Sequence, residues 1–502
     1  MPYLRALLSI LVAAVFAGSL RATWSIILID TRTGEIAIAS ATCLTGFDLQ
    51  REACVVLVGR GAAAAQSFVD LSGANRVLIF TQLGAGTDPT QILAQLAATD
   101  TGHQSRQYGI VDTQGRAIGF SGTGAGAFAG HLTGQIGTIV YAVQGNVLTG
   151  QPVITAAEQA IRNTPGDLAE KLMAAMQAAR LFGGDGRCSC NPNLPTQCGA
   201  PPASFTKSAH IGYMLVARPG DTDGVCSGAV GCANGSYYLN FNVANQQNSS
   251  PEPIDQLRQR FLNWRLQTVL RPDHFLSSIA VEPRRLLDDG ITTTRLQIEL
   301  RDWRGVRLPF GGAQVAVTQT SGPALAIGGT VDNGDGSYSV PVGPANAVGT
   351  ATLRVVVNDG QGPVLLTPSP QVEVAADSLW LSRGAVGAVS GGSFNAVLRG
   401  GTAFANRPYL LLASASGTSP GIPLAPGVTL PLVPDGLTFF LLELAPSTTS
   451  LLGPLDAQGR ATLPFAVPPG LFASLPGGRL DFAWLTLAPI DFASNPAGID
   501  LR

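Results

Sequence analysis

The chain has few histidines and few charged residues, and both shortages limit what it can do. Of its 502 residues only 4 are histidine, and charged residues make up 13%, with a formal net charge of −2. A typical globular domain carries about 25% charged residues, and the basic residues here form no dense run. The electrostatic footprint of a nucleic-acid-binding protein is therefore missing, and we expect no nucleic-acid partner.

The second half of the chain lacks cysteine. All 7 cysteines lie at positions 43, 54, 188, 190, 198, 226 and 232. Their number fits an oxidising compartment, and their odd count leaves one thiol without a partner. The pairs Cys43 with Cys54 and Cys226 with Cys232 would each close a short loop, although spacing alone does not fix connectivity. We expect disulfide staples in the first half of the chain and one free thiol.

The loop from Cys188 to Cys198 contains closely spaced cysteines, as metal sites do, but it lacks the histidines that often complete such a site. No histidine stands at ligand spacing, and the Asn, Pro and Gly residues between the cysteines are typical of a loop. A loop pinned by disulfides is favoured over zinc. We therefore predict no metal and no cofactor.

Long apolar runs are confined to the start of the chain. Residues 1–22 hold a charged start at Arg5, an apolar run over 6–17 and small residues over 17–22, which predicts a signal peptide. Cleavage after Ala22 would place Thr23 at the mature amino terminus, whereas Ala17-Gly18-Ser19 also fits the small-x-small rule and would leave Leu20 first. No later run approaches the roughly 20 residues that cross a bilayer. We expect a secreted protein, extracellular, periplasmic or at the cell surface, without a membrane span after leader removal.

The first domain alternates hairpins with helices. The predicted strands cover 24–29, 35–42, 107–112, 117–121, 138–144 and 211–217, and the predicted helices cover 88–98, 153–162, 167–181 and 253–271. Because the strands come in hairpins, sheets covered by helices are favoured over a parallel doubly wound sheet. The pattern predicts an α+β domain over residues 23–272.

Composition changes after residue 272. Short strands with Thr, Val and Gly-rich turns follow at regular spacing, the pattern of β-sandwiches. The expected strands are 294–300, 313–319, 337–342, 351–357, 409–413, 437–444, 461–467 and 482–487. We predict two all-β sandwich domains, over residues 275–376 and 377–502.

A series of ordered motifs carries a family resemblance. They are Thr23-Trp24-Ser25-Ile26, Asp30, Thr33-Gly34-Glu35, Gln66, Arg106-Gln107, Gly109-Ile110-Val111-Asp112, Gly115-Arg116, Ala129-Gly130-His131, Tyr141 to Leu148, Gly183-Gly184-Asp185 and Arg187. Together they resemble the domain of unknown function 1028 family, assigned to the N-terminal-nucleophile (Ntn) hydrolase superfamily, over residues 23–248. The resemblance implies a four-layer αββα sandwich and a threonine nucleophile, but no substrate.

Two features depart from that family's pattern. A loop over residues 188–207 is inserted after Arg187, and Cys43 stands where many relatives carry a basic residue. Without that base a proteasome-like scheme is weakened.

The later domains resemble modules of exported bacterial proteins. Residues 277–374 are similar to bacterial immunoglobulin-like repeats of surface proteins, chiefly through the segment Asp332-Asn333-Gly334-Asp335-Gly336-Ser337-Tyr338. Its two neighbouring carboxylates fall short of the six to eight oxygens that calcium prefers, so we expect a hairpin turn there. The last domain looks like a C-terminal sandwich module, through Gly417-Thr418-Ser419-Pro420-Gly421.

Thr23 is the candidate nucleophile. An amino-terminal threonine can attack an amide or ester because its α-amine, with a pKa of about 7.7, takes the hydroxyl proton. Gln66, Gln144 and Asn146 carry amides that could donate to a developing oxyanion, and Gly145 would let the backbone come close. Alternatively, Thr23 is only the first β-branched residue of a strand, and Asn146 is a turn residue that satisfies its own loop.

Other polar residues are weaker candidates. Asp185 and Arg187 could orient the threonine amine, or could follow a helix C-cap as a solvated pair. Ser208 and Ser25 could hydrogen-bond that amine, although most serines at strand ends are structural. His103 and His131 lack a sequence-near partner for a triad, and we expect both to be structural or at the surface.

These observations favour an exported amidohydrolase-like protein that acts on an amide bond of a small molecule or peptide. The alternative is a non-catalytic surface or binding protein, which keeps the fold and uses its sandwiches to bind cell-surface or matrix components.

Overall fold

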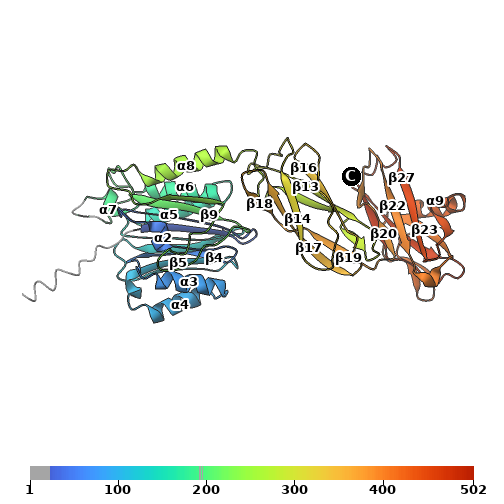
Figure 1. Cartoon of the computed structure of the whole chain (residues 1–502), viewed down its shortest axis with the longest axis horizontal. Helices are drawn as coiled ribbons and strands as arrows, with labels where there is room; N and C mark the ends of the chain where they lie inside the picture. The colour runs from blue at the N-terminus through green and yellow to red at the C-terminus, as the bar shows by residue number, and fades with distance from the viewer. Residues whose placement is uncertain (1–22, 192–193, 195) are drawn as a thin grey trace, which may run out of the picture. The chain divides into compact units, whose positions relative to one another are not determined.

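The computed structural model describes residues 23–191, 194 and 196–502 (Figure 1). The predicted signal peptide and both of its cleavage sites lie outside the described residues. Contacts within the chain divide it into two units, with the boundary between Gln267 and Thr268. Among the described residues, no helix is both long enough and apolar enough to span a membrane.

The first unit contains a six-stranded antiparallel sheet in the order β10-β9-β2-β1-β8-β7. Its strands are β1 (Thr23–Asp30), β2 (Glu35–Thr42), β7 (Gly130–Ile136), β8 (Ile139–Asn146), β9 (Ile211–Ala217) and β10 (Leu239–Val243). β1 lies in the middle, paired with β2 on one side and β8 on the other. The hairpin predicted at its start is confirmed.

A second sheet of the first unit has the order β3-β4-β5-β6. Its strands are β3 (Cys54–Leu57), β4 (Gly61–Ser67), β5 (Arg106–Asp112) and β6 (Ala117–Ser121). Its inner face packs on the first sheet through a shared apolar core that includes Ile27, Ile38, Val56 and Val111. The two sheets therefore face each other.

Helices cover the outer face of each sheet (Figure 1). The helices α5 (Pro152–Asn163), α6 (Leu168–Leu181) and α8 (Pro253–Gln267) pack on the first sheet, and α3 (Ala74–Gly84) and α4 (Pro89–Thr99) pack on the second. The short helices α2 (Leu49–Ala53) and α7 (Gly186–Ser189) complete the unit. Because both faces of the first sheet are covered, all eight residues of β1 are buried.

The helices α4 and α6, which each begin with a strong N-cap residue, were correctly predicted from the sequence. Asp88 accepts a hydrogen bond from the Thr90 amide at the start of α4, and Asp167 accepts one from the Glu170 amide at the start of α6. No strand was predicted for β4, whose sequence GAAAAQS has no β-branched residue. There the burial between a sheet and two helices decides the conformation, since alanine by itself does not favour a strand.

Three disulfides staple the first unit. They join Cys43 to Cys188, Cys190 to Cys198 and Cys226 to Cys232. The prediction of one free thiol is confirmed at Cys54, which is buried, and the Cys226 pair is confirmed as well. The predicted Cys43–Cys54 pair is wrong: Cys54 opens β3 in the second sheet, while Cys43 follows β2 in the first.

The second unit opens with a β-sandwich of two facing sheets, in the orders β11-β13-β16-β15 and β12-β19-β17-β14, with β18 paired to β17. Its strands are β11 (Ser278–Glu282), β12 (Arg285–Leu287), β13 (Thr294–Glu299), β14 (Gln314–Ser321), β15 (Val331–Asp332), β16 (Ser337–Val342), β17 (Gly349–Asn358), β18 (Pro363–Leu366) and β19 (Gln371–Ala375). The predicted acidic glycine segment forms the turn between β15 and β16, and Gly334 and Gly336 there have φ of 79°. That left-handed backbone is the reason the turn needs glycine.

A second β-sandwich follows, with sheets β20-β22-β27 and β21-β29-β28-β23-β26 and a small β24-β25 pair. Its strands are β20 (Leu379–Leu381), β21 (Ala385–Val386), β22 (Gly392–Arg399), β23 (Pro408–Ser414), β24 (Ile422–Ala425), β25 (Val428–Leu430), β26 (Leu452–Pro454), β27 (Arg460–Val467), β28 (Arg479–Thr486) and β29 (Ala497–Leu501). The predicted strand over 437–444 is wrong, because this segment is helix α9 (Gly436–Leu444). Asp435 and Thr438 form a capping box at its start, a local signal that outweighs the apolar run.

Candidate functional site

Thr23 is the first residue of the central strand β1. In the register of the sheet it lies opposite Asn146, the last residue of β8, and both residues are buried. Trp24, Ile26 and Leu28 pack toward the helices, whereas Ile27 and Ile29 pack toward the second sheet. Because side chains alternate along a strand, those of Thr23 and Ser25 face the second sheet.

Gln66, at the end of β4, reaches β1 from the facing sheet. Its Nε2 donates to the Thr23 carbonyl oxygen at 2.8 Å and to Gln107 Oε1 at 2.8 Å. Its Oε1 accepts from the Ser25 hydroxyl and, at 3.2 Å, from Gln144 Nε2. One buried amide thus ties the start of β1 to strands of both sheets.

Further polar side chains extend this cluster in two directions. Ser40 Oγ lies 2.5 Å from Ser25 Oγ and donates to the Tyr213 hydroxyl at 3.0 Å. On the other side, Gln107 Nε2 donates to Ser121 Oγ and to the Gly145 carbonyl oxygen, both at 2.8 Å. We call the set Ser25, Ser40, Gln66, Gln107, Gln144, Asn146 and Tyr213 the inter-sheet polar cluster.

Gln144 and Gly109 fit closely against each other in this cluster. Gln144 Nε2 donates to the Ala64 carbonyl oxygen at 3.1 Å. Its Oε1 is buried and has no hydrogen-bond partner among the described residues. A Cβ added to Gly109 would lie 2.6 Å from that oxygen, so only glycine leaves room for the amide.

Asn146 is anchored to the loops at the same edge of the sheets. Its Nδ2 donates to the Ala125 carbonyl oxygen at 2.9 Å and to Ser67 Oγ at 3.2 Å. Ser67, the last residue of β4, has φ of 73°, and Val147, directly after β8, has φ of 51°. Left-handed backbone is a genuine outlier for a β-branched residue, and such strain clusters at functional sites.

Asp185 and Arg187 lie beside the end of β2, and Asp185 also forms a bridge with Leu148, which follows β8. Asp185 is fully buried and caps α7, and its Oδ2 accepts from the Cys43 amide at 2.6 Å. Arg187 donates to the same oxygen at 2.8 Å and to Thr42 Oγ1 at 3.2 Å. The interpretation of these two residues as a solvated pair is therefore wrong, although Gly183 does follow the end of α6 with φ of 101°.

Ser208 is engaged by an acid from another element. Its hydroxyl donates to Glu252 Oε1 at 3.0 Å and its amide donates to Oε2 at 2.6 Å. Burial raises the pKa of Glu252, while these hydrogen bonds lower it in part. The structure thus joins Ser208 to Glu252, next to the first turn of α8.

The two candidate histidines differ in position. His103 is buried and stacks on Phe120, with ring centroids 4.2 Å apart. His131, on β7, lies with Nδ1 3.0 Å from Ser121 Oγ, the oxygen that also accepts from Gln107. His131 is exposed, and partial desolvation of its ring lowers its pKa. His131 therefore touches the outer end of the polar cluster, a link that the sequence did not indicate.

Sequence reasoning missed Gln107, Ser40 and Tyr213 as members of the cluster. The available signal was alternation: Gln107 shares a strand face with Gly109 and Val111, and Val111 lies in the apolar inter-sheet core. A glutamine on such a face is costly to bury unless it is hydrogen-bonded, which marks it as a member of a network.

The segment Gly417-Thr418-Ser419-Pro420-Gly421 has the G-x-S-x-G spacing of a nucleophile elbow. It connects β23 to β24, whereas an elbow needs a strand followed by a helix. Ser419 is exposed in this loop. The spacing is therefore no sign of a second hydrolytic site.

Comparison with known proteins agrees with the two-part organisation. Residues 23–191 match the model of a family of unknown function (DUF1028), and residues 273–377 match that of invasin, domain 3. The predicted DUF1028 resemblance is thus confirmed over residues 23–191, and the match ends inside the loop closed by Cys190 and Cys198. No match was found among curated proteins.

Solved structures with similarity to the chain include a DUF1028 family protein and two bacterial adhesins. A Silicibacter pomeroyi protein of the DUF1028 family is 20% identical, with 49% of this chain and 94% of that chain covered and a TM-score of 0.35. The Yersinia pseudotuberculosis adhesin InvE is 17% identical, with a TM-score of 0.18, and the match covers 45% of this chain and only 59% of that one. The Escherichia coli adhesin FdeC is 10% identical over 97% of this chain and 99% of that chain, with a TM-score of 0.20.

The chain thus joins a segment that matches the DUF1028 model, residues 23–191, to one that matches the invasin domain 3 model, residues 273–377, in a mixed α and β unit followed by β-sandwiches.

Proposed function

We propose that the chain is an exported amidohydrolase whose first unit is an αββα sandwich of the Ntn-hydrolase type, with Thr23 as its nucleophile. The supporting observation is the position of Thr23 at the start of the central strand, between two facing sheets and against the inter-sheet polar cluster. Burying many polar side chains lowers the stability of a fold unless each is hydrogen-bonded. Their use in a catalytic site would explain why they are present between the two sheets.

The chemistry needs only the chain's own groups. Once residues 1–22 are removed, the Thr23 α-amine takes the hydroxyl proton while Oγ attacks the amide carbonyl carbon, whose π electrons move to the oxygen. The tetrahedral intermediate then collapses, the C–N bond breaks, and the leaving nitrogen takes the proton from the ammonium. Water hydrolyses the resulting ester and frees Thr23. No cofactor takes part in this scheme.

The cluster has two roles in this proposal. Gln66 positions the nucleophile, because its Nε2 holds the Thr23 carbonyl oxygen at 2.8 Å. Asn146 lies opposite Thr23 in the register and would donate to the oxyanion by giving up its Nδ2 hydrogen bond to Ala125 or the one to Ser67. The strained backbone at Ser67 and Val147 lies directly beside Asn146, and strain of this kind clusters at functional sites.

Asp185 and Ser208 receive positioning roles. Asp185 fixes the end of β2 through the Cys43 amide, and Ser208 fixes the start of β9 through Glu252. The proposed substrate is an amide of a small molecule or peptide, taken up outside the cell or in the periplasm.

The test is covalent labelling of secreted protein by a β-lactone, read on the amino-terminal peptide. A chain that begins at Thr23 should be labelled, Thr23→Ala should not, and Thr23→Ser should keep part of the rate. One residue added ahead of Thr23 should abolish labelling, since the amine becomes a peptide nitrogen. Thr101→Ala, at an exposed position, is the matched control and should label like the parent.

Three outcomes would contradict the nucleophile. The first is a mature chain that begins at Leu20 and is never trimmed further. The second is equal labelling of the parent and the extended chain, and the third is no labelling of a parent shown to begin at Thr23.

A second function, surface binding by the sandwiches, is favoured by the match of residues 273–377 to invasin domain 3. We propose that the second unit binds cell-surface or matrix components. The full chain with Thr23→Ala should then bind to whole cells or extracellular matrix as tightly as the parent, whereas a chain ending at residue 272 should not. Equal retention of the short chain would contradict this role.

We further propose domains over residues 23–272, 275–376 and 377–502. The link after α8 is held by the second unit, because Arg271 pairs with Asp359 at 2.8 Å and the Asp273 amide donates to the Arg301 carbonyl oxygen at 2.7 Å. Because the contacts divide the chain between Gln267 and Thr268, we expect limited proteolysis to cut directly after α8 and to release a folded first unit. Cuts scattered through the sandwiches, with none at this link, would count against it.

A further inference from the structure

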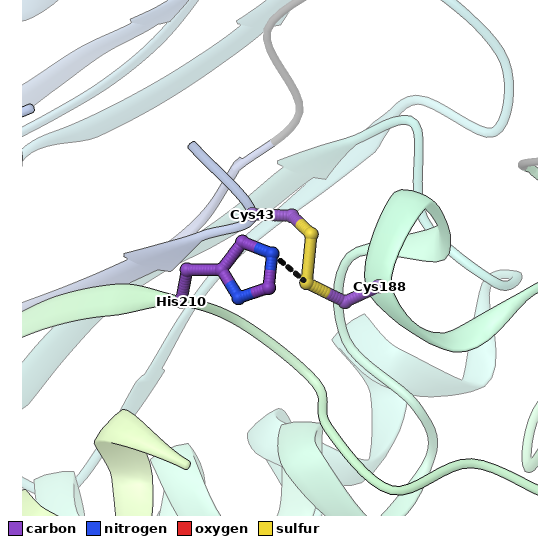
Figure 2. A group of neighbouring side chains, drawn as sticks. All are labelled: Cys43, Cys188 and His210. Atoms are coloured by element: carbon purple, nitrogen blue, oxygen red, sulfur yellow. Dashed lines mark hydrogen bonds between the residues drawn. A yellow bond between two sulfur atoms is a disulfide. The ribbon is translucent and has the colours of Figure 1, made fainter. Parts of the chain in front are cut away.

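A disulfide and a histidine meet at the edge of the first sheet. Cys43 directly follows β2, Cys188 lies in α7, and His210 directly precedes β9. Figure 2 shows the His210 ring turned toward the Cys43–Cys188 disulfide, with Nε2 3.5 Å from Cys188 Sγ. The proposed hydrolytic mechanism uses none of these three side chains.

The backbone holds these residues together independently of the disulfide. The His210 amide donates to the Thr42 carbonyl oxygen at 2.8 Å, which fixes His210 beside Cys43. The Cys43 amide donates to Asp185 Oδ2, and the Cys188 amide donates to the Asp185 carbonyl oxygen at 3.1 Å. Breaking the S–S bond therefore leaves both sulfur-bearing residues tied to Asp185.

The arrangement has the donors and dimensions of a zinc site. The two Sγ atoms and a ring nitrogen of His210 lie within 4.8 Å of one another. Tetrahedral zinc, with Zn–S near 2.3 Å and Zn–N near 2.0 Å, puts its ligand atoms about 3.5–3.8 Å apart. The distance from Nε2 to Cys188 Sγ, 3.5 Å, already fits, and the two sulfurs, now bonded to each other, need to separate. The Cα atoms, 5.8 Å apart, allow this by side-chain rotation.

We propose that Cys43, Cys188 and His210 form a redox-convertible metal site: a staple when oxidised, and a Zn²⁺ site when reduced. A dithiol reductant gives two electrons and two protons to the S–S bond, becomes a cyclic disulfide itself, and leaves two thiols. Zn²⁺ then binds both sulfurs and His210, and the two thiol protons are released. Sulfur and imidazole ligands favour zinc over magnesium or calcium.

The site has three protein ligands and a fourth position for water or another small ligand. Three-ligand sites with an open position are the type in which zinc polarises a bound group, whereas structural zinc sites usually have four protein ligands. All three residues are partly exposed, so that reductant and metal can reach them. This proposal stands apart from the Thr23 mechanism and does not depend on it.

The first test uses the unmodified full chain. It is reduced with dithiothreitol, desalted without oxygen, and treated with iodoacetamide in the presence or absence of Zn²⁺, and each cysteine peptide is then quantified. Zn²⁺ should slow alkylation of Cys43 and Cys188 at least tenfold and leave Cys190 and Cys198 unprotected. Equal reactivity of Cys43 and Cys188 with and without Zn²⁺ would overturn the proposal.

The second test is a titration with Co²⁺, which absorbs strongly when bound to thiolates. The reduced parent should bind one ion, the oxidised parent none, and Cys188→Ser should lose the thiolate absorption. His210→Gln should weaken binding at least tenfold, whereas Cys232→Ser, in another cysteine pair, should bind like the parent. All chains except the oxidised parent are compared in the reduced state, and circular dichroism checks that each is folded. Absorption that survives Cys188→Ser, or that disappears in Cys232→Ser, would overturn the proposal.

Discussion

The central strands of the first unit, such as β1 and β9, are buried on both faces, whereas strands of the sandwich that follows, such as β13, are buried on one. All eight residues of β1 are buried, while in β13 exposed residues alternate with buried ones. The core of that sandwich is apolar, but the space between the sheets of the first unit ends in the polar cluster around Gln66. Strands that are covered on both faces can carry a network of buried, hydrogen-bonded side chains that is suited to catalysis. Strands with one exposed face leave a surface that is available for binding.

Reduction of the disulfides should give the largest difference in stability between the two units, because all of the cysteines lie in the first unit. By chain entropy, the Cys43–Cys188 bridge, with a sequence separation of 145, should stabilise the fold by about 5 kcal/mol. The Cys226–Cys232 bridge, with a separation of 6, should contribute about 2 kcal/mol. In calorimetry, a dithiol should lower the transition of the first unit and leave that of the second unchanged.

Paired alanine variants serve as the control for this measurement. Replacing Cys43 and Cys188 should lower the first transition more than replacing Cys226 and Cys232. A fall of both transitions by the same amount on reduction would mean that the two units do not unfold separately.

Replacing one glutamine in each unit compares the contribution of a buried polar side chain to stability with that of an exposed one. Gln66→Leu removes the partner of the Thr23 carbonyl oxygen and of Gln107, so it should lower the free energy of unfolding by about 1–3 kcal/mol. Gln297→Leu, at an exposed position of β13, should change it by less than about 0.5 kcal/mol. Urea unfolding measures both, and equal effects would show that the polar cluster has no special role in stability.

A smaller effect is expected from His103 as pH falls. Its burial against Phe120 lowers its pKa from 6.5, Arg106 lowers it further, and Asp100 raises it. Below pH 6.5 the unfolded chain therefore binds a proton that the folded chain refuses, and stability falls until pH passes the folded pKa. His103→Gln should flatten this part of the stability curve. An unchanged slope, or an NMR pKa above 6.5, would contradict the expectation.

The last expectation concerns chemical reactivity and involves no change in stability: the thiol of Cys54 should not react in the folded chain. Burial raises the pKa of its thiol to about 12. Compared with an ordinary thiol of pKa about 8.5, its thiolate fraction near neutral pH is roughly a thousandfold lower. Iodoacetamide should modify Cys54 in urea but not in native protein. Rapid modification in native buffer would show that β3 opens easily.

Much of the local structure followed from the sequence. The hairpin at residues 24–42, the helices capped by Asp88 and Asp167, and the turn at Gly334 and Gly336 rest on residues a few positions apart, and each was found. The same holds for Thr23 at the start of a strand. Helix α9 was missed although Asp435 and Thr438 stand at its start, because its apolar run was given more weight than its cap.

The sequence by itself determined that Thr23 begins a strand, that one of the seven cysteines has no partner, and that helices give way to sandwiches after α8. Only the tertiary structure decided that Cys43 pairs with Cys188 across 145 positions, that Asp185 is buried, and that Gln107 and Tyr213 join Gln66 between the sheets. The reason is physical: turns and caps depend on hydrogen bonds between near neighbours, whereas these contacts exist only once two sheets have packed face to face.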